Sequence, residues 1–246
     1  MSAEKCCEIL GADRSSRFVL CCDHASNAVP PSVNDGDLGL SPDDMTRHIA
    51  YDVGAAGLTR ALADQLGAPA ILSCWSRLVI DLNRAEWDPT LVRRLYDGTV
   101  VPANRAADAT EIARRLDAYY RPYHDALARF LEKRDAVLVS IHSFTPCLRG
   151  RIPRPWHIGI LHSPRDDRFS KGLIARLGSV SAAPVGDNEP YSGHLPGDTI
   201  DRHALDHGRH NTLIEVRNDL IGEPEGQRDM ARFLAPILQE TLEELT

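Results

Sequence analysis

The 246-residue sequence has no apolar run that approaches the ~20 residues needed for a membrane-spanning helix. Residues 1–17 also lack the apolar stretch of a secretory signal peptide. There is no basic cluster either, because the formal net charge is −7 at pH 7 and the arginines are spread along the chain. We therefore expect a cytoplasmic protein that binds neither membranes nor nucleic acid.

The six cysteines show no C-x-x-C spacing, and four of them form the adjacent pairs Cys6-Cys7 and Cys21-Cys22. Adjacent pairs make poor disulfide frameworks, so we expect reduced thiols that mostly serve in packing. The sequence also lacks internal repeats and low-complexity tracts. Its length allows one large α/β domain with a buried core, and we predict a single domain over residues 1–246.

Apolar runs and helical periodicity alternate along the chain, which favours a three-layer α/β/α sandwich with a mostly parallel mixed sheet. The predicted strands cover residues 18–22, 70–73, 77–81, 136–140, 158–162 and 211–217. The predicted helices cover residues 41–66, 106–134 with an interruption at Pro122, 167–177 with Gly178 as terminator, and 227–245. Residues 186–206 show no regular period. A ligand crevice is expected beyond the carboxyl ends of the strands.

Two histidines, His24 and His142, follow apolar strand-like runs at the point where the sequence turns polar. Parallel strands bring such positions to one edge of a sheet, where neutral imidazoles are common zinc ligands. A catalytic zinc needs three protein ligands and an open position for water. The alternative is a hydrogen-bonded histidine that caps a strand end, but the matching pair favours a hydrolase metal site.

Glu215 lies within an otherwise apolar strand, where an ionised carboxylate is costly unless it is paired or linked to a metal. Burial would raise its pKa toward neutrality, as a general base requires. Strand alternation places Arg217 on the same face, so a salt bridge between these two residues is an equally good interpretation.

The segment 81–84 (DLNR) places a guanidinium beside an amide, a combination suited to a substrate carboxylate. Arg77 lies four residues before Asp81, on the same face of the predicted strand, and adds a second cation. The alternative is a strand-end ion pair between Asp81 and an arginine.

Six segments, in order along the chain, resemble the N-formylglutamate amidohydrolases. They are residues 22–27 (CDHASN), 48–55 (HIAYDVGA), 76–84 (SRLVIDLNR), 141–146 (IHSFTP), 186–192 (GDNEPYS) and 214–221 (IEVRNDLI). The ordered set is more specific than any single motif. The resemblance implies a zinc-peptidase-like (phosphorylase/hydrolase-like) α/β fold, one divalent metal ion such as Zn2+ per chain, and hydrolysis of an N-acyl amino acid such as N-formyl-L-glutamate.

The resemblance also implies roles for individual residues. His24 and His142 become metal ligands, Glu215 the general base, and Arg77 a group facing the carbonyl oxygen. The implied substrate-binding residues are Asp81, Asn83, Arg84, Asn188, Tyr191 and Arg217. Arg149, Arg151 and Arg217 are candidate cations for a side-chain carboxylate, and the Tyr191 loop is either a lid over the substrate or an ordered surface loop.

The third metal ligand is left open by the sequence. Zinc carboxypeptidases carry a glutamate three residues after the first histidine, where this chain has Asn27, a poorer donor. Asp52 or His48, one turn apart on the predicted first helix, could supply the ligand instead, or could form a supporting pair or a surface contact.

Two other functions remain as alternatives. One is a deacylating or carboxypeptidase-like enzyme that acts on another N-acyl amino acid or small peptide, and the other is a metal-independent binding protein.

Overall fold

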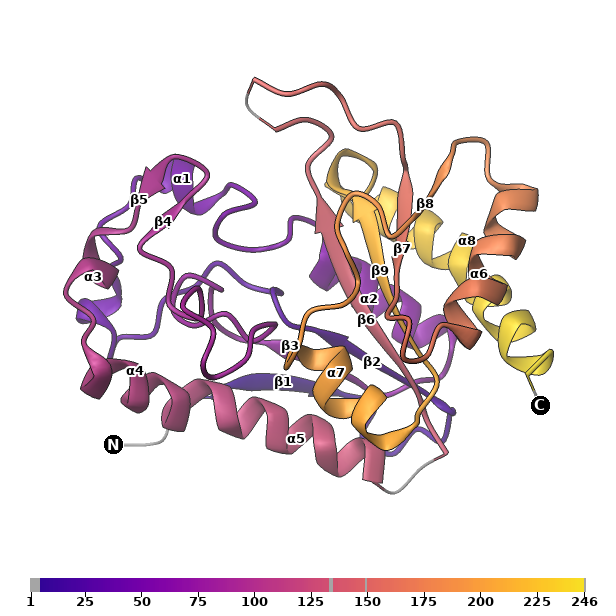
Figure 1. The fold of residues 1–246 in the computed structure, drawn as a ribbon, viewed down its shortest axis with the longest axis horizontal. Coiled ribbons are helices and arrows are strands. Elements are labelled where there is room, and N and C mark those ends of the chain that lie inside the picture. The colour runs from indigo at the N-terminus through magenta and orange to yellow at the C-terminus, as the bar shows by residue number, and fades with distance from the viewer. Residues whose placement is uncertain (1–4, 133–134, 149, 246) are drawn as a thin grey trace.

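The computed structural model describes residues 5–132, 135–148 and 150–245, which form a seven-stranded sheet with helices on both faces (Figure 1). The strands of this sheet are β1 (Cys7–Leu10), β2 (Phe18–Cys22), β3 (Ala70–Ser73), β6 (Val137–Phe144), β7 (Ile158–Leu161), β8 (Val185–Asp187) and β9 (Asn211–Arg217). A separate hairpin joins β4 (Leu95–Tyr96) and β5 (Thr99–Val100). The helices are α1 (Pro42–Met45), α2 (Ala55–Gln65), α3 (Pro102–Arg105), α4 (Ala109–Arg115), α5 (Arg121–Glu132), α6 (Arg168–Val180), α7 (Thr199–His203) and α8 (Pro224–Glu243).

The strand order is β1-β3-β2-β6-β9-β7-β8. Strands β3, β2, β6 and β9 are parallel to one another, while β1 and the β7–β8 pair run antiparallel to their neighbours in this central group. The predicted mostly parallel mixed sheet is confirmed. The central strands read as continuous apolar runs because helices cover both of their faces.

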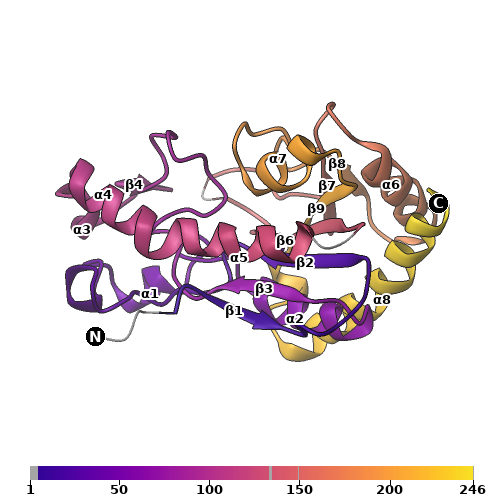
Figure 2. The same cartoon turned by 90° about the horizontal axis from the view of Figure 1, so that it is seen from below.

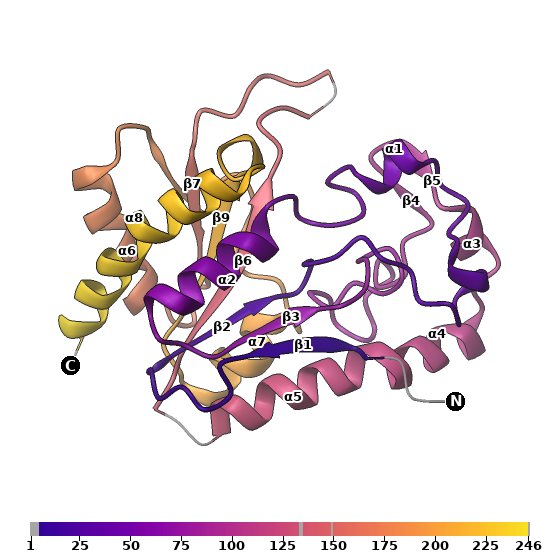
Figure 3. The ribbon, with the colours of Figure 1, turned by 180° about the vertical axis from the view of Figure 1, so that it is seen from behind.

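Strand alternation divides the core into two layers. Val137, Val139 and Ile141 of β6 pack with residues of α2, α6 and α8, whereas Leu138 packs with residues of the Leu116–Tyr120 turn and α5 on the other face. Helices α2 and α8 lie in front of the sheet in Figure 3, and α5 runs along the opposite side in Figure 2. His142 alternates with Ile141 and therefore points toward the α5 and α7 side.

The predicted helix 41–66 is wrong, because the structure has two helices separated by an irregular connection over residues 46–54. Gly54 has φ +80° and lies so close to the chain that a Cβ would meet the Ile221 carbonyl oxygen at 2.1 Å. The connection is held by tertiary contacts, including Asp52 N–H to the His24 carbonyl at 2.9 Å. Periodicity alone did not reveal this break.

The predicted strand 77–81 is also wrong, because residues 77–79 form a turn. Both edges of β3 are already paired, with β1 and β2, so this segment cannot pair beside the strand that precedes it. Leu78, Val79 and Ile80 still pack in the core. The segment is apolar because it is buried, and not because it belongs to a strand.

Other predicted elements differ in their bounds. Strand β6 continues through Phe144, so His142 lies inside it and not beyond its end; α6 continues past Gly178 to Val180. The run 106–134 is divided by a π-turn at Leu116–Tyr120, which places Pro122 near the start of α5; Arg134 lies outside the described residues. Residues 186–206 contain the end of β8 and helix α7. In the described residues, no helix is both long enough and apolar enough to cross a membrane.

Candidate active site

A cavity of about 260 Å³ lies at the carboxyl ends of β6 and β9, on the face of the sheet that carries α7. Its walls include many of the residues that the sequence predicts for the site, from six separate segments. The predicted residues in its walls are His24, His48, Asp52, Arg77, Asn83, Arg84, His142, Tyr191 and Glu215. The parallel strands thus bring most of the predicted site together.

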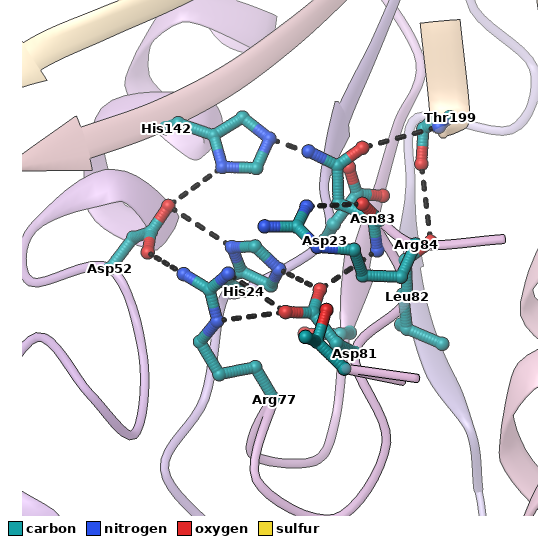
Figure 4. Close-up of polar contacts among 12 residues, drawn as sticks. Asp23, His24, Asp52, Arg77, Asp81, Leu82, Asn83, Arg84, His142 and Thr199 are labelled. Carbon is teal, nitrogen blue, oxygen red and sulfur yellow. Dashed lines mark hydrogen bonds and ion pairs between the residues drawn. The ribbon is translucent and has the colours of Figure 1, made fainter. Parts of the chain in front are cut away.

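Asp52 contacts both histidines (Figure 4). Its Oδ2 is 2.7 Å from His142 Nδ1 and 3.3 Å from His24 Nδ1. All three side chains are buried, and their ligand atoms lie within 4.8 Å of one another. Two imidazole nitrogens and one carboxylate oxygen are a suitable donor set for a divalent metal, so these residues fit a metal ion.

The other candidates for a third ligand have different partners. Asn27 donates its side-chain N–H to the Met45 carbonyl at 2.9 Å. His48 lines the cavity, but its Nε2 lies 3.5 Å from Asp97 of the β4–β5 turn. His48 is not part of the cluster that His24, Asp52 and His142 form, and Asn27 is not among the residues that line the cavity.

Each of the two histidines contacts a further buried carboxylate through its other ring nitrogen. His24 Nε2 lies 2.7 Å from Asp81, and His142 Nε2 lies 3.4 Å from Asp23. Asp23 also accepts a hydrogen bond from the Tyr123 hydroxyl group at 2.7 Å. Such carboxylates fix the orientation and tautomer of metal-binding histidines. Sequence reasoning missed Asp23, although it directly precedes His24.

Asp81 does not line the cavity, contrary to its predicted substrate-binding role, because its carboxylate is fully buried and binds other side chains. It accepts from Arg77 Nη2 at 2.8 Å, and Arg77 Nη1 lies 3.4 Å from Asp52 (Figure 4). Burial by itself would raise the pKa of Asp81, but the Arg77 and His24 charges hold it well below its usual value. Arg77 therefore joins the two carboxylates while it still borders the cavity.

Glu215 of β9 lies opposite His142 of β6 in the parallel register. Its side chain is buried, and its Oε2 has no hydrogen-bond partner in the described residues. Burial raises the pKa of Glu215 to about 8. The alternative ion pair with Arg217 does not form, because Arg217 pairs with Asp219 at 2.8 Å.

Asn83 and Arg84 reach the cavity from the segment that follows the turn at residues 77–79. Asn83 Oδ1 accepts from the Thr199 N–H at the start of α7, at 3.2 Å. Arg84 Nη1 donates to the Asn83 carbonyl at 2.7 Å, and its Nε lies 3.9 Å from Asp88. These contacts orient an amide and a guanidinium beside the same cavity.

The loop that carries Tyr191 is packed tightly against the sheet. Asn188 Oδ1 accepts from His162 N–H and Gly193 N–H, so Asn188 holds the loop and does not line the cavity, contrary to its predicted role. A Cβ at Gly159 of β7 would meet the Glu189 carbonyl oxygen at 2.0 Å. These anchors favour an ordered wall over a loose lid, with Tyr191 and residues 192–195 lining the cavity.

Two of the predicted cations for a second carboxylate, Arg151 and Arg217, do not line the cavity. Arg217 is paired with Asp219, Arg151 is exposed on the surface, and Arg149 lies outside the described residues. Besides Asp23, two further charged residues near the site were missed. Asp198 lines the cavity beside Thr199, and Arg154 stacks on Tyr191 and Phe144. Neither has a sequence signal that separates it from other charged loop residues.

The comparisons with known proteins agree with one another. The family model described as N-formylglutamate amidohydrolase matches residues 16–222. A curated protein named N-formylglutamate deformylase from Pseudomonas putida is 27% identical over 208 residues, which cover 74% of this chain and 76% of that protein. Another of the same name, from Pseudomonas aeruginosa, is 28% identical over 208 residues, which cover 74% of this chain and 77% of that protein.

Two solved structures share the fold. A gene product of Agrobacterium tumefaciens is 33% identical with a TM-score of 0.92, covering 98% of this chain and 96% of that one. An N-formylglutamate amidohydrolase from Ralstonia eutropha is 19% identical with a TM-score of 0.73, covering 97% of this chain and 99% of that one.

Proposed function

The chain belongs to the N-formylglutamate amidohydrolase family, and from this premise we propose that it hydrolyses the amide bond of N-formyl-L-glutamate to formate and L-glutamate. One observation carries the proposal. The buried cluster of His24, Asp52 and His142 lies in the same cavity as the buried carboxylate of Glu215. Metal-dependent amide hydrolysis needs a metal ion to polarise the carbonyl and a general base to activate water, and this cavity contains a candidate metal site beside a carboxyl group of raised pKa.

We propose that His24, Asp52 and His142 hold one divalent metal, with zinc as the preferred ion for two nitrogen donors and one oxygen donor. When bound, the metal would supply a Lewis acid that lowers the pKa of water and polarises the amide carbonyl. Asp81 and Asp23 orient the two histidines through their outer nitrogens.

Glu215 acts as the proton carrier. Its carboxylate takes a proton from the water that attacks the formyl carbon. As the C–N bond breaks, the carboxyl group gives this proton to the departing amine nitrogen, so Glu215 ends the reaction as it began. A pKa raised to about 8 by burial suits a group that must accept and release a proton near neutrality.

Asn83 and Arg84 bind the α-carboxylate of the substrate. A guanidinium can offer a carboxylate two parallel hydrogen bonds, and the Thr199 contact orients the Asn83 amide beside it. Arg77 borders the cavity between Asp52 and Asp81, and its guanidinium hydrogen-bonds the carbonyl oxygen as negative charge develops there. The six free cysteines fit a reducing compartment, and we propose the cytoplasm as the location.

The test combines formate release from N-formyl-L-glutamate with elemental analysis of protein purified without chelator. We expect about one zinc per chain and formate release that a chelator abolishes and added zinc restores. Zinc without formate release would overturn the substrate, and activity that survives complete metal removal would overturn the metal mechanism.

A further inference from the structure

Arg154 lies in the loop after β6 and is held beside the cavity by two aromatic rings. Its Cζ is 5.0 Å from the ring centre of Tyr191 and 5.6 Å from that of Phe144. Both rings belong to cavity-lining residues. Its Nη1 donates to the Thr145 carbonyl at 3.0 Å, and its backbone N–H donates to the Pro146 carbonyl at 2.8 Å. The position of the guanidinium is thus set by backbone and ring contacts.

The charge of Arg154 is not matched by a carboxylate. Within residues 5–132, 135–148 and 150–245, no aspartate or glutamate oxygen lies within 4.0 Å of its guanidinium nitrogens. Other arginines around the site differ in this respect, since Arg77 pairs with Asp81 at 2.8 Å and Arg217 with Asp219 at 2.8 Å. An unmatched guanidinium that stacks on two cavity-lining rings is suited to an anionic group of a ligand.

Arg84 and Arg154 have different surroundings. Arg84 donates to the Asn83 carbonyl and lies 3.9 Å from Asp88, whereas Arg154 stacks on Tyr191 and Phe144. They also come from different segments, Arg84 from the chain after β3 and Arg154 from the chain after β6. The proposed α-carboxylate position at Arg84 therefore leaves Arg154 free for a second anion.

We propose that Arg154, stacked on Tyr191, recognises the side-chain carboxylate of the substrate and makes the enzyme selective for acidic N-acyl amino acids. This inference rests on the proposed function. Tyr191 and Phe144 hold the guanidinium plane and shield it in part from water, which strengthens its attraction for a carboxylate. Arg154 is in this sense a specificity-determining residue, separate from Asn83 and Arg84.

The test compares N-formyl-L-glutamate with N-formyl-L-glutamine, which has nearly the same shape but a neutral side chain. In Arg154→Gln, we expect kcat/KM for the glutamate substrate to fall about 10- to 100-fold, mostly through KM, because a charge-assisted hydrogen bond is lost. The kcat/KM for the glutamine substrate should stay within about twofold. Arg154→Lys should restore part of the selectivity because it keeps the charge.

Arg151→Gln is the matched control, since Arg151 is an exposed arginine in the same loop, whereas Arg154 is half-buried against Tyr191 and Phe144. It should leave both substrates unchanged. An equal loss on both substrates in Arg154→Gln would overturn the inference, since it would show a structural role only. Unchanged selectivity would also overturn it.

A binding measurement separates this inference from the proposed function. If the wild-type protein hydrolyses neither formyl substrate, the proposed function fails, and thermal shifts with N-acetyl-L-glutamate and N-acetyl-L-glutamine then decide the inference. A larger shift in Tm with the dicarboxylate, lost in Arg154→Gln, would support Arg154 as the recognition residue. Equal shifts, or no shift with either ligand, would overturn it.

Discussion

His142 and Glu215 occupy paired positions on the neighbouring parallel strands β6 and β9, and both side chains border the same cavity. This register places a candidate metal ligand beside a carboxyl group that burial keeps partly protonated near neutrality. The chemistry proposed for the site depends on this pair. Strand pairing sets the separation of the two residues, since both lie within β6 and β9 and not in loops.

Glu215→Gln should lower kcat about 10²- to 10⁴-fold, because the amide cannot accept a proton from water. The metal content should not change, since Glu215 is not part of the His24, Asp52 and His142 cluster. Steady-state formate release and elemental analysis measure the two effects. Glu240→Gln on α8, where Glu240 pairs with Arg176, is a control for loss of a carboxylate far from the site. Retained turnover in Glu215→Gln would assign the proton transfer to another group.

Asp52→Asn should reduce the metal content well below one ion per chain, because an amide oxygen is a poorer donor than a carboxylate. Asn27→Ala and His48→Gln should keep the metal, since Asn27 binds the Met45 carbonyl and does not line the cavity, and His48 lies outside the cluster beside Asp97. Elemental analysis of the three variants tests the third ligand directly. Metal loss in Asn27→Ala or His48→Gln, with Asp52→Asn fully loaded, would contradict the assignment.

Arg84→Lys should raise KM about 10-fold or more with a smaller change in kcat, because a point charge cannot reproduce two parallel hydrogen bonds. Both N-formyl-L-glutamate and N-formyl-L-glutamine should be affected equally, since each carries the α-carboxylate. This common loss distinguishes Arg84 from Arg154. Kinetics identical to wild type would remove Arg84 from the substrate site.

Gly159→Ala should reduce the free energy of unfolding by about 1–3 kcal/mol, because its Cβ would meet the Glu189 carbonyl oxygen and displace the Tyr191 loop. We also expect a higher KM with unchanged metal content. Gly178→Ala in α6 is the matched control, since its added Cβ would meet no described atom within 4 Å beyond its chain neighbours and the local helix backbone, and alanine favours a helix. Denaturant titration compares the two, and equal stability would show that the loop has room to shift.

His124 and His203 form a buried pair between α5 and α7, with Nδ1 of one 2.9 Å from Nε2 of the other. Burial lowers the pKa of His124 to about 3 and that of His203 to about 4, below their usual value near 6.5. The folded state therefore binds fewer protons than the unfolded state, and stability falls as the pH drops below about 6.5. For His124 this loss is about 2 kcal/mol between pH 7 and pH 5.

His124→Gln should lose less stability than wild type over this pH interval, although it is less stable at pH 7. The comparison uses Tm or denaturant midpoints at pH 7 and pH 5. His207→Gln, at an exposed histidine, should keep the wild-type dependence on pH. Equal stability of the wild-type protein at pH 7 and pH 5 would refute the proposal that the buried His124–His203 pair makes folding dependent on pH.

Several elements were predictable because they depend on local pattern. Strands 18–22 and 211–217 have the predicted bounds, since each is an apolar run that ends at polar residues. The strand predicted at 77–81 failed because burial produces the same apolar pattern in a turn. The helix predicted at 41–66 failed because the path of residues 46–54 depends on contacts with the chain around His24 and Ile221.

The sequence by itself determined the central strands, the α/β class and the set of polar residues at one sheet edge. Only the tertiary structure decided which partner each polar group has, because these contacts join residues 28 positions apart for Asp52 and His24 and 90 positions apart for Asp52 and His142. It brought Asp52, and neither Asn27 nor His48, to the histidines, and it set Arg154 against Tyr191. Local spacing carries no information about such pairs, since they form only when the sheet and its loops close around the cavity.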